Sequence, residues 1–179
     1  MHGLILAELK KYVDTKLGKD AWNGLLAAAG LSHRVYLTGV PYPDEEVMAL
    51  VTTASKTTGL PAADILEDFG EFIVPDLVQT YRPFIKPGWK ALDMIEHTEE
   101  TIHRAVRLRD PGAKPPQLKV TRVDARSLQL VYTSPRKLCA VAKGIAKGVG
   151  AFYKQPLTLT ETTCMLRGDA VCAITIGYA

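Results

Sequence analysis

The sequence lacks the features that mark membrane, secreted and nucleic-acid-binding proteins. The apolar run over residues 3–7 gives way to Glu8 and Lys10, too early for a secretion signal or a membrane span. Basic residues form no block interleaved with aromatics, and the formal net charge is only +3. We therefore expect a cytoplasmic protein that binds neither a membrane nor nucleic acid.

Cysteine is also scarce. The chain has three, an odd number that cannot close a disulfide framework. In a reducing compartment, three cysteines point to a metal site or to free thiols. The 179 residues, 47% of them hydrophobic and 23% charged, suit one globular domain with a sizeable core.

Apolar residues recur at helical spacing through the first part of the chain. The expected helices cover residues 4–17, 20–29, 45–58 and 61–70, with another turn or two before Pro75. The longest helical candidate follows at residues 89–107.

From residue 117 onward the pattern changes to the alternation that predicts strands. Two antiparallel hairpins are expected, over residues 118–134 and 157–178, with a helix over 136–154 between them. Three glycines in that helix each cost about 1 kcal/mol of helix propensity, which indicates close packing against a neighbour. Helices followed by an antiparallel sheet with one inserted helix predict an α+β fold.

Three polar side chains stand two residues apart at the end of the first hairpin. If the segment is extended, Tyr132, Ser134 and Arg136 leave the same face of the strand. A guanidinium beside two hydroxyls makes a fork for a carboxylate or a phosphate. The alternative is a strand end whose polar residues face water.

The longest helical candidate contains two histidines. At about 100° per residue, His97 and His103 point roughly 120° apart and cannot both face the centre of one pocket. His103 lies at the border of an apolar stripe that includes Leu92 and Val106. Taken alone, this position suits a packed core histidine as well as it suits a ligand.

Taken together, these residues resemble a known family. Gly70 follows an acidic helix, Pro116 comes thirteen residues after His103, and Tyr-Thr-Ser-Pro-Arg occupies residues 132–136. In this order they are similar to the H-NOX family of haem nitric oxide/oxygen binding domains, over the entire chain. The resemblance implies haem b, with His103 as the axial ligand of the iron and the three polar side chains of the motif on the propionates. It also places Pro116 against the porphyrin, although a proline there would equally stop the helix before the strand.

The same resemblance implies an architecture. A single domain over residues 1–179 would divide into a helical distal subdomain at about 1–60 and a larger proximal subdomain at about 61–179. The proximal subdomain would carry the antiparallel sheet and the long helix with the histidine. The haem would lie between the two subdomains.

The residues that the resemblance places over the iron are all aliphatic: Ile5, Leu9, Ile73, Val141 and Ile145. In family members that hold oxygen, a tyrosine hydroxyl stands where this chain has Val141. Bound oxygen is polarised and needs such a donor, whereas nitric oxide binds strongly without one. We therefore expect ferrous haem that binds nitric oxide, and also carbon monoxide, and excludes oxygen. Plain core packing would use the same aliphatic residues.

The cysteines match a zinc-bearing subgroup of the family, in which three cysteines and one histidine bind the metal. Cys139, Cys164 and Cys172 stand at the cysteine positions, but Glu161 replaces the histidine. Zinc on three thiolates and a carboxylate, three thiols plus water, and three small buried hydrophobes without metal all remain open. Glu161 and Cys164 differ in strand parity, so joint ligation would require a bulge.

The function implied by the resemblance is sensing rather than catalysis. Nitric oxide would weaken the bond to His103, the two subdomains would rotate, and a separate histidine kinase or cyclic-di-GMP enzyme would respond. One alternative is a haem-free zinc or thiol redox sensor that uses Cys139, Cys164 and Cys172. Another is a haem peroxidase, which is disfavoured because the resemblance places no histidine or arginine over the iron.

Overall fold

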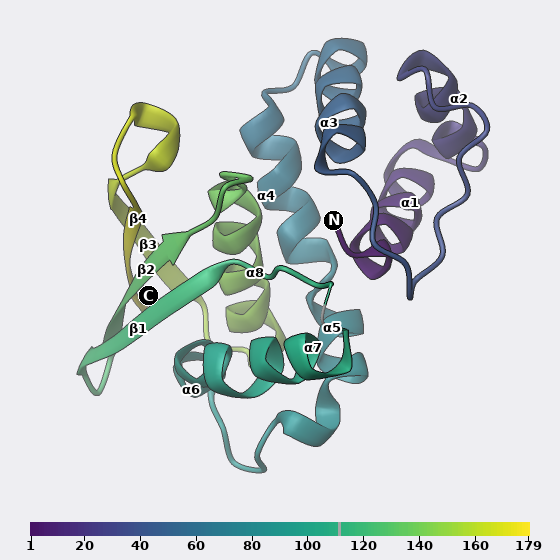
Figure 1. Ribbon diagram of the computed structural model, residues 1–179. Helices are drawn as coiled ribbons and strands as arrows, with labels where there is room; N and C mark the ends of the chain where they lie inside the picture. The colour runs from purple at the N-terminus through teal and green to yellow at the C-terminus, as the bar shows by residue number, and fades with distance from the viewer. Residues whose placement is uncertain (111) are drawn as a thin grey trace.

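The computed structural model describes residues 1–110 and 112–179, and its helices and antiparallel sheet confirm the predicted α+β fold. The helices are α1 (Gly3–Leu17), α2 (Ala21–Ala28), α3 (Asp44–Thr58), α4 (Ala62–Phe72), α5 (Val74–Thr80), α6 (Ala91–His97), α7 (Arg104–Arg109) and α8 (Cys139–Phe152). The strands are β1 (Gln117–Asp124), β2 (Ser127–Thr133), β3 (Leu157–Thr163) and β4 (Cys172–Tyr178). In Figure 1, α1–α3 stand on one side, the sheet stands on the other, and α4 and α8 lie between them. Among the described helices, none has the length and apolar character needed to cross a membrane.

The helix that carries His103 is present but is not regular. Between α6 and α7, the segment Glu99–His103 forms a π-helical turn, in which the His103 N–H donates to the Thr98 carbonyl at 3.0 Å. Apolar spacing predicted one continuous helix because the residues on either side of this turn each have helical spacing, and no proline or glycine marks the turn itself. π turns inside helices are frequent at functional sites.

The helical part of the chain continues beyond Pro75, further than the sequence suggested. The sequence suggested that helix would end before Pro75, yet α5 runs to Thr80 with that proline in its first turn. Proline is tolerated there because its missing N–H would have no partner inside the helix. The extension brings Val74 and Leu77 to the wall of the cavity described below.

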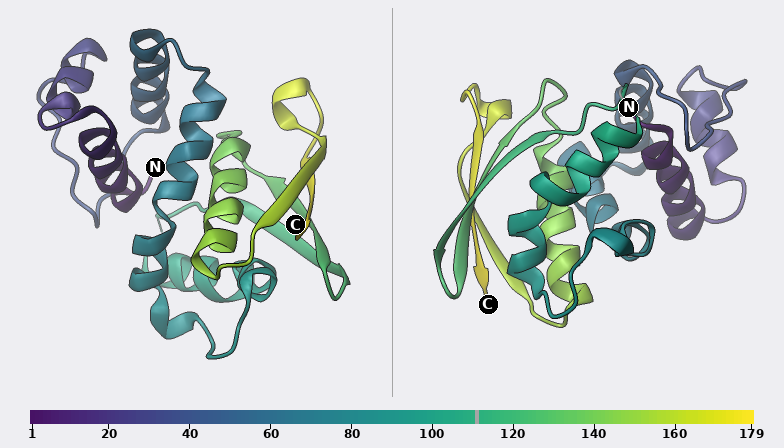
Figure 2. Two further views of the ribbon diagram at one scale, coloured as in Figure 1. Left: turned by 180° about the vertical axis from the view of Figure 1, so that it is seen from behind. Right: turned by 60° about the horizontal axis from the view of Figure 1, so that its bottom comes forward.

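The strands form one antiparallel sheet in the order β1-β2-β4-β3. In its register Tyr132 on β2 pairs with Leu118 on β1 and with Cys172 on β4. Buried residues of β2 and β4 pack with residues of α6 and α8, so the histidine helix and α8 share a core with the sheet. Two further views show both helices on one face of the sheet (Figure 2).

Close contact between α4 and α8 explains the glycines that cost helix propensity. A methyl group at Gly144 would lie 1.9 Å from the Glu67 carbonyl oxygen, and one at Gly70 would lie 2.4 Å from the Val141 carbonyl oxygen. Neither backbone can move aside without disturbing its own helix. The predicted close packing is therefore confirmed, with α4 as the main neighbour of Gly144, whereas Gly150 lies against Gln155 and Leu157.

Candidate functional site

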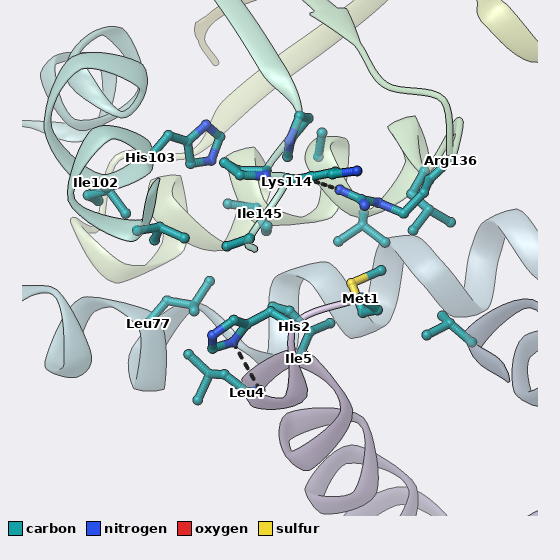
Figure 3. Close-up of a pocket in the computed structure, with 18 of the residues that line it drawn as sticks. Met1, His2, Leu4, Ile5, Leu77, Ile102, His103, Lys114, Arg136 and Ile145 are labelled. Atoms are coloured by element: carbon teal, nitrogen blue, oxygen red, sulfur yellow. Dashed lines mark hydrogen bonds between the residues drawn. The ribbon is translucent and has the colours of Figure 1, made fainter. Parts of the chain in front are cut away.

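A cavity of about 550 Å³ opens between the N-terminal helices and the part of the chain that carries α5–α8. Its volume falls in the range of small-molecule and cofactor pockets, about 300–1,000 Å³. Most lining side chains are aliphatic or aromatic. Eight of the predicted cofactor residues line it: Ile5, Leu9, His103, Pro116, Tyr132, Arg136, Val141 and Ile145. Figure 3 shows His103 on one side of the cavity, with Ile5 and Leu77 on the opposite side.

Two predicted cofactor residues lie outside the lining of this cavity. Ile73 is fully buried in the core at the junction of α4 and α5, and its neighbours Val74 and Leu77 face the cavity instead. Ser134 is 1% exposed, and its hydroxyl accepts a hydrogen bond from the Arg136 N–H at 3.3 Å. In this structure Ser134 therefore orients the backbone of the arginine.

His103 lines the cavity, and one of its ring nitrogens contacts a carboxylate. Its Nδ1 lies 2.8 Å from Glu99 Oε2, and its side chain is 15% exposed. Burial lowers the pKa of His103 below the ordinary histidine value, although the Glu99 hydrogen bond and charge act in the opposite direction. A neutral ring with its proton on Nδ1 leaves the Nε2 lone pair free to bind a metal.

The second histidine of the same segment has different surroundings. His97 stacks on Trp89 with ring centroids 4.9 Å apart, and its Nδ1 lies 2.6 Å from Glu100 Oε1. Among the described residues that line the cavity, His97 is absent. The prediction that the two histidines do not share a pocket is confirmed.

Arg136 connects the polar motif to the N-terminal helices. Its guanidinium reaches the Lys114 carbonyl oxygen and lies 3.4 Å from Asp44 Oδ2, while the Met1 nitrogen lies 2.7 Å from Asp44 Oδ1. Burial alone would raise the pKa of Asp44, but the bonds and charges of Met1 and Arg136 outweigh it and lower this pKa. Nearby Tyr132 is 2% exposed, and burial raises the pKa of its phenol.

Sequence reasoning missed His2, which lines the same cavity. Its Nδ1 accepts a hydrogen bond from the Leu4 N–H at 3.2 Å and so caps α1. Its Nε2 lies 3.3 Å from Asp110 Oδ2. If Nδ1 is the acceptor, the ring proton is on Nε2. Among the described residues, Asp110 Oδ2 is buried and has no hydrogen-bond partner, so this contact is an approach of charges and not a hydrogen bond. The only sequence signal was a polar residue at the start of a helix, and the partner Asp110 lies far along the chain.

The cysteines form a separate cluster on the other side of Tyr132. Cys139 Sγ lies 3.7 Å from Cys164 Sγ, which lies 4.0 Å from Cys172 Sγ. One ligand atom from each cysteine and a carboxylate oxygen of Glu161 all lie within 4.8 Å of one another. Burial, followed by contacts with the other two thiols, raises the pKa of Cys139 to about 12.

An irregular strand brings Glu161 into this cluster. The β3–β4 register shifts between Glu161 and Thr163, which supplies the bulge that joint ligation with Cys164 requires. Glu161 Oε2 faces Lys143 at 3.7 Å and Arg167 at 3.5 Å. Its Oε1 is buried and has no hydrogen-bond partner. An unpaired carboxylate oxygen beside three thiols has the composition of a metal ligand set.

Comparison with protein families decides the identity of the domain. The family model described as haem-NO-binding matches residues 2–161. The chain belongs to this family, the H-NOX domains. H-NOX domains bind haem and gases such as nitric oxide and carbon monoxide, and they are sensors rather than catalysts.

Solved H-NOX structures share this fold. The crystal structure of an H-NOX protein from S. oneidensis in the Fe(II)NO ligation state superposes with a TM-score of 0.93, at 24% sequence identity, and covers 100% of this chain and 99% of that one. The unliganded Fe(II) H-NOX protein from K. algicida gives a TM-score of 0.88 at 20% identity, covering 100% of this chain and 97% of the other.

Curated relatives include a much larger protein. Soluble guanylate cyclase 89Da of Drosophila melanogaster is 23% identical over 137 residues, which are 76% of this chain and 20% of the cyclase. The chain thus matches about a fifth of the length of that relative. The shared part is the sensor domain, and the resemblance says nothing about a cyclase activity in this chain.

Proposed function

We propose that this H-NOX domain senses nitric oxide through ferrous haem b bound in the cavity, and that it excludes oxygen. The observation that carries the proposal is the asymmetry of the cavity: one wall holds the buried His103, and the opposite wall holds mainly aliphatic side chains with His2 among them. When bound, the haem supplies an iron with an open axial position for a diatomic gas.

The cavity fits this group on three counts. It is large and apolar enough for a porphyrin, and His103 presents a free Nε2 as axial ligand. At the rim, Arg136 and the Tyr132 phenol provide donors for the propionates. Pro116 lines the cavity close to His103, in keeping with a contact against the porphyrin.

Oxygen exclusion follows from the missing donor. Ile5, Leu9, Val141 and Ile145 have no N–H or O–H group in their side chains, and polarised oxygen requires one. Side chains with donors also line the cavity, among them His2 and Tyr81. The Nε2 atom of His2 lies 3.3 Å from Asp110 Oδ2, which keeps the ring beside that carboxylate. Nitric oxide and carbon monoxide need no such donor.

For the signal, we propose that residues 1–60 rotate relative to residues 61–179. The link through Asp44, which contacts both Met1 and Arg136, joins the two parts at the cavity rim. His103 would be released when the gas binds, and the contacts of the helices around it would then change. The receiver would be a histidine kinase or a cyclic-di-GMP enzyme supplied as a separate protein.

The decisive experiment is the absorption spectrum of the reduced protein under argon, air and nitric oxide. We expect a Soret band under argon that stays unchanged in air and shifts with nitric oxide. A stable oxygen complex in air would refute oxygen exclusion. A colourless protein that takes up no added haem would refute the haem proposal itself. His103→Ala should lose the vibrational band of the histidine–iron bond.

We further propose that the cysteine cluster holds a structural zinc ion through Cys139, Cys164, Cys172 and Glu161. The unpaired Glu161 Oε1 beside the three thiols supports this ligand set. Four protein ligands with no open position are typical of structural rather than catalytic zinc. Metal analysis of anaerobically purified protein should give one zinc per chain, and Cys172→Ser should lose it. If Glu161→Ala retains full zinc, water completes the site instead.

The alternative of a haem-free thiol redox sensor has weaker support. The thiolate is the reactive form of cysteine, and burial raises the pKa of both Cys139 and Cys172. In the metal-free state these thiols would therefore react slowly at neutral pH. Rapid alkylation of the folded protein by iodoacetamide, with a functional change that does not depend on haem, would favour the redox sensor.

A further inference from the structure

Two histidine–glutamate pairs lie on the same helical segment in contrasting environments. His103 pairs with Glu99, and the two side chains are 15% and 29% exposed. His97 pairs with Glu100, and these are 35% and 67% exposed. Only the first pair includes a residue that lines the cavity. The His103–Glu99 pair is therefore the functional candidate, and the His97–Glu100 pair serves as its control.

Glu99 is held in place from three directions. Its Oε2 lies 2.8 Å from His103 Nδ1 and accepts a hydrogen bond from the Leu118 N–H at 3.1 Å. Its Oε1 accepts a bond from Arg107 Nη2 at 2.5 Å. Three donors, one of them the cationic guanidinium of Arg107, therefore hold the Glu99 carboxylate in place.

The charge on this acceptor matters for a ligand histidine. An outer carboxylate that accepts the Nδ1 proton fixes the tautomer and the ring orientation, and it makes the other nitrogen a stronger electron donor. The Pro116 carbonyl also faces the His103 ring, but it is a neutral acceptor. Glu99 is thus the group in this environment that adds negative charge to the ring.

We propose that Glu99 is the positioning residue for His103 and that its carboxylate strengthens the bond between His103 and the haem iron. This inference rests on the proposed function, and it names a residue that determines how strongly His103 binds the iron. A stronger bond is harder for nitric oxide to break, so Glu99 sets the threshold at which His103 is released. Because Glu99 also holds the Leu118 N–H, a movement of His103 reaches β1 and the paired Tyr132 on β2.

The test compares Glu99→Gln with Glu100→Gln in the haem-loaded protein. Glutamine at position 99 keeps an oxygen acceptor for the ring but removes the charge. We expect the histidine–iron stretching band of the ferrous protein to move to lower frequency in resonance Raman spectra. The reduction potential should become more positive. The rate at which nitric oxide breaks the bond should rise about 10-fold, the lower end of what loss of an outer partner does to a metal site.

The control is matched in position and chemistry. Glu100→Gln removes the same charge from a histidine pair on the adjacent residue, one that does not line the cavity. All three readouts should stay at the wild-type values. If Glu99→Gln and Glu100→Gln give the same stretching frequency and potential, Glu99 has no such role.

A second variant covers the case in which Glu99→Gln does not fold. Arg107 competes with His103 for the Glu99 carboxylate, so Arg107→Gln should move the stretching band to higher frequency. A shift to lower frequency, or none, would overturn the inference. These outcomes differ from failure of the proposed function, in which the wild-type protein itself shows no histidine–iron band.

Discussion

Two faces of α8 serve two different sites. Val141 and Ile145 line a cavity in which His103 is the proposed ligand, and most of the other lining side chains are apolar. Cys139, in the first turn of the same helix, faces a cluster whose four candidate ligand atoms lie within 4.8 Å of one another. The cavity leaves room for a large group and a gas, whereas the cluster leaves room for a single ion.

This difference in the number of protein ligands suits the cavity to gas sensing and the cysteine cluster to stabilising the fold. A site with one protein ligand can respond, because the bond to that ligand can break while apolar contacts keep the group in place. A site with four protein ligands contributes to folding directly. We therefore expect substitutions in the cluster to change stability, and substitutions in the cavity to change gas binding at nearly constant stability.

The largest expected effect is in the cluster. Cys172→Ser should lower the free energy of unfolding by about 4 kcal/mol or more, because loss of a structural metal belongs to the few changes of that size. Urea unfolding of the two proteins, both purified in the presence of zinc, measures the difference. A chelator should destabilise the wild type and leave the variant unchanged. A loss of only about 1–3 kcal/mol, the cost of one poorly satisfied buried hydroxyl, would instead indicate three packed thiols without metal.

The next largest loss of stability is expected from a substitution in α8, the helix that contributes to both sites. Gly144→Ala places a methyl group 1.9 Å from the Glu67 carbonyl oxygen and should cost about 3 kcal/mol or more through forced separation of α4 and α8. Gly24→Ala in α2 is the control, because nothing lies within 4 Å of that position. It should raise stability by about 0.5–1 kcal/mol. Equal effects of the two variants in thermal unfolding would contradict the close contact.

In the cavity, a single hydroxyl should change which gas is held. Val141→Tyr adds a donor to the cavity wall, and a hydrogen bond to a polarised ligand is worth about 1.5–3 kcal/mol. We expect the reduced variant to form an oxygen complex in air, detected by its absorption spectrum. Val141→Phe adds the same ring without the hydroxyl and should form none. An oxygen complex in both variants would show that ring size, not the donor, controls oxygen binding.

The smallest effect concerns the link at the cavity rim. The pKa of Asp44 is lower in the folded protein than in the unfolded chain. At a pH between these two pKa values the unfolded chain binds more protons, so the free energy of unfolding rises with pH in this range. Its contribution is present above about pH 4 and is lost as the pH falls through the folded pKa. Because the Asp44 side chain is 40% exposed, Asp44→Asn should cost only about 0.5–1 kcal/mol at pH 7.

Urea unfolding at pH 7, 5 and 3 tests this pH dependence. The difference between wild type and Asp44→Asn should persist at pH 5 and be smaller at pH 3. Asp20→Asn is the control, since the Asp20 side chain makes no capping hydrogen bond at the start of α2. A difference that grows as the pH falls would reverse the assigned role of Asp44.

Local patterns in the sequence predicted most of the architecture. The α+β order, the hairpin that carries Tyr132 and the divergence of His97 from His103 all follow from periodicity and spacing, and the structure confirms them. Strand parity showed that joint ligation by Glu161 and Cys164 would need a bulge or an irregular strand end, and the register does shift beside Glu161. Each of these depends on residues close together in sequence, where one repeat length governs the geometry.

Features that depend on distant segments were not predictable in this way. Asp44 meets Arg136 across 92 positions of sequence, and His2 reaches Asp110 only because the chain folds back. Ile73 was expected at the cavity wall, but the helical course through Pro75 turns Val74 and Leu77 toward it. No local pattern contains these partners.

The π-helical turn at Glu99–His103 has a consequence for sequence length. A π turn contains about one residue more than an α turn, so it acts as a single-residue insertion accommodated without a loop. Deleting one residue there would restore the α repeat and rotate α6 by about 100° relative to His103. Either the apolar side of α6 or the histidine would then face the wrong way. The number of residues between α6 and His103 is therefore fixed, because α6 must bury its apolar side while the His103 ring faces the cavity.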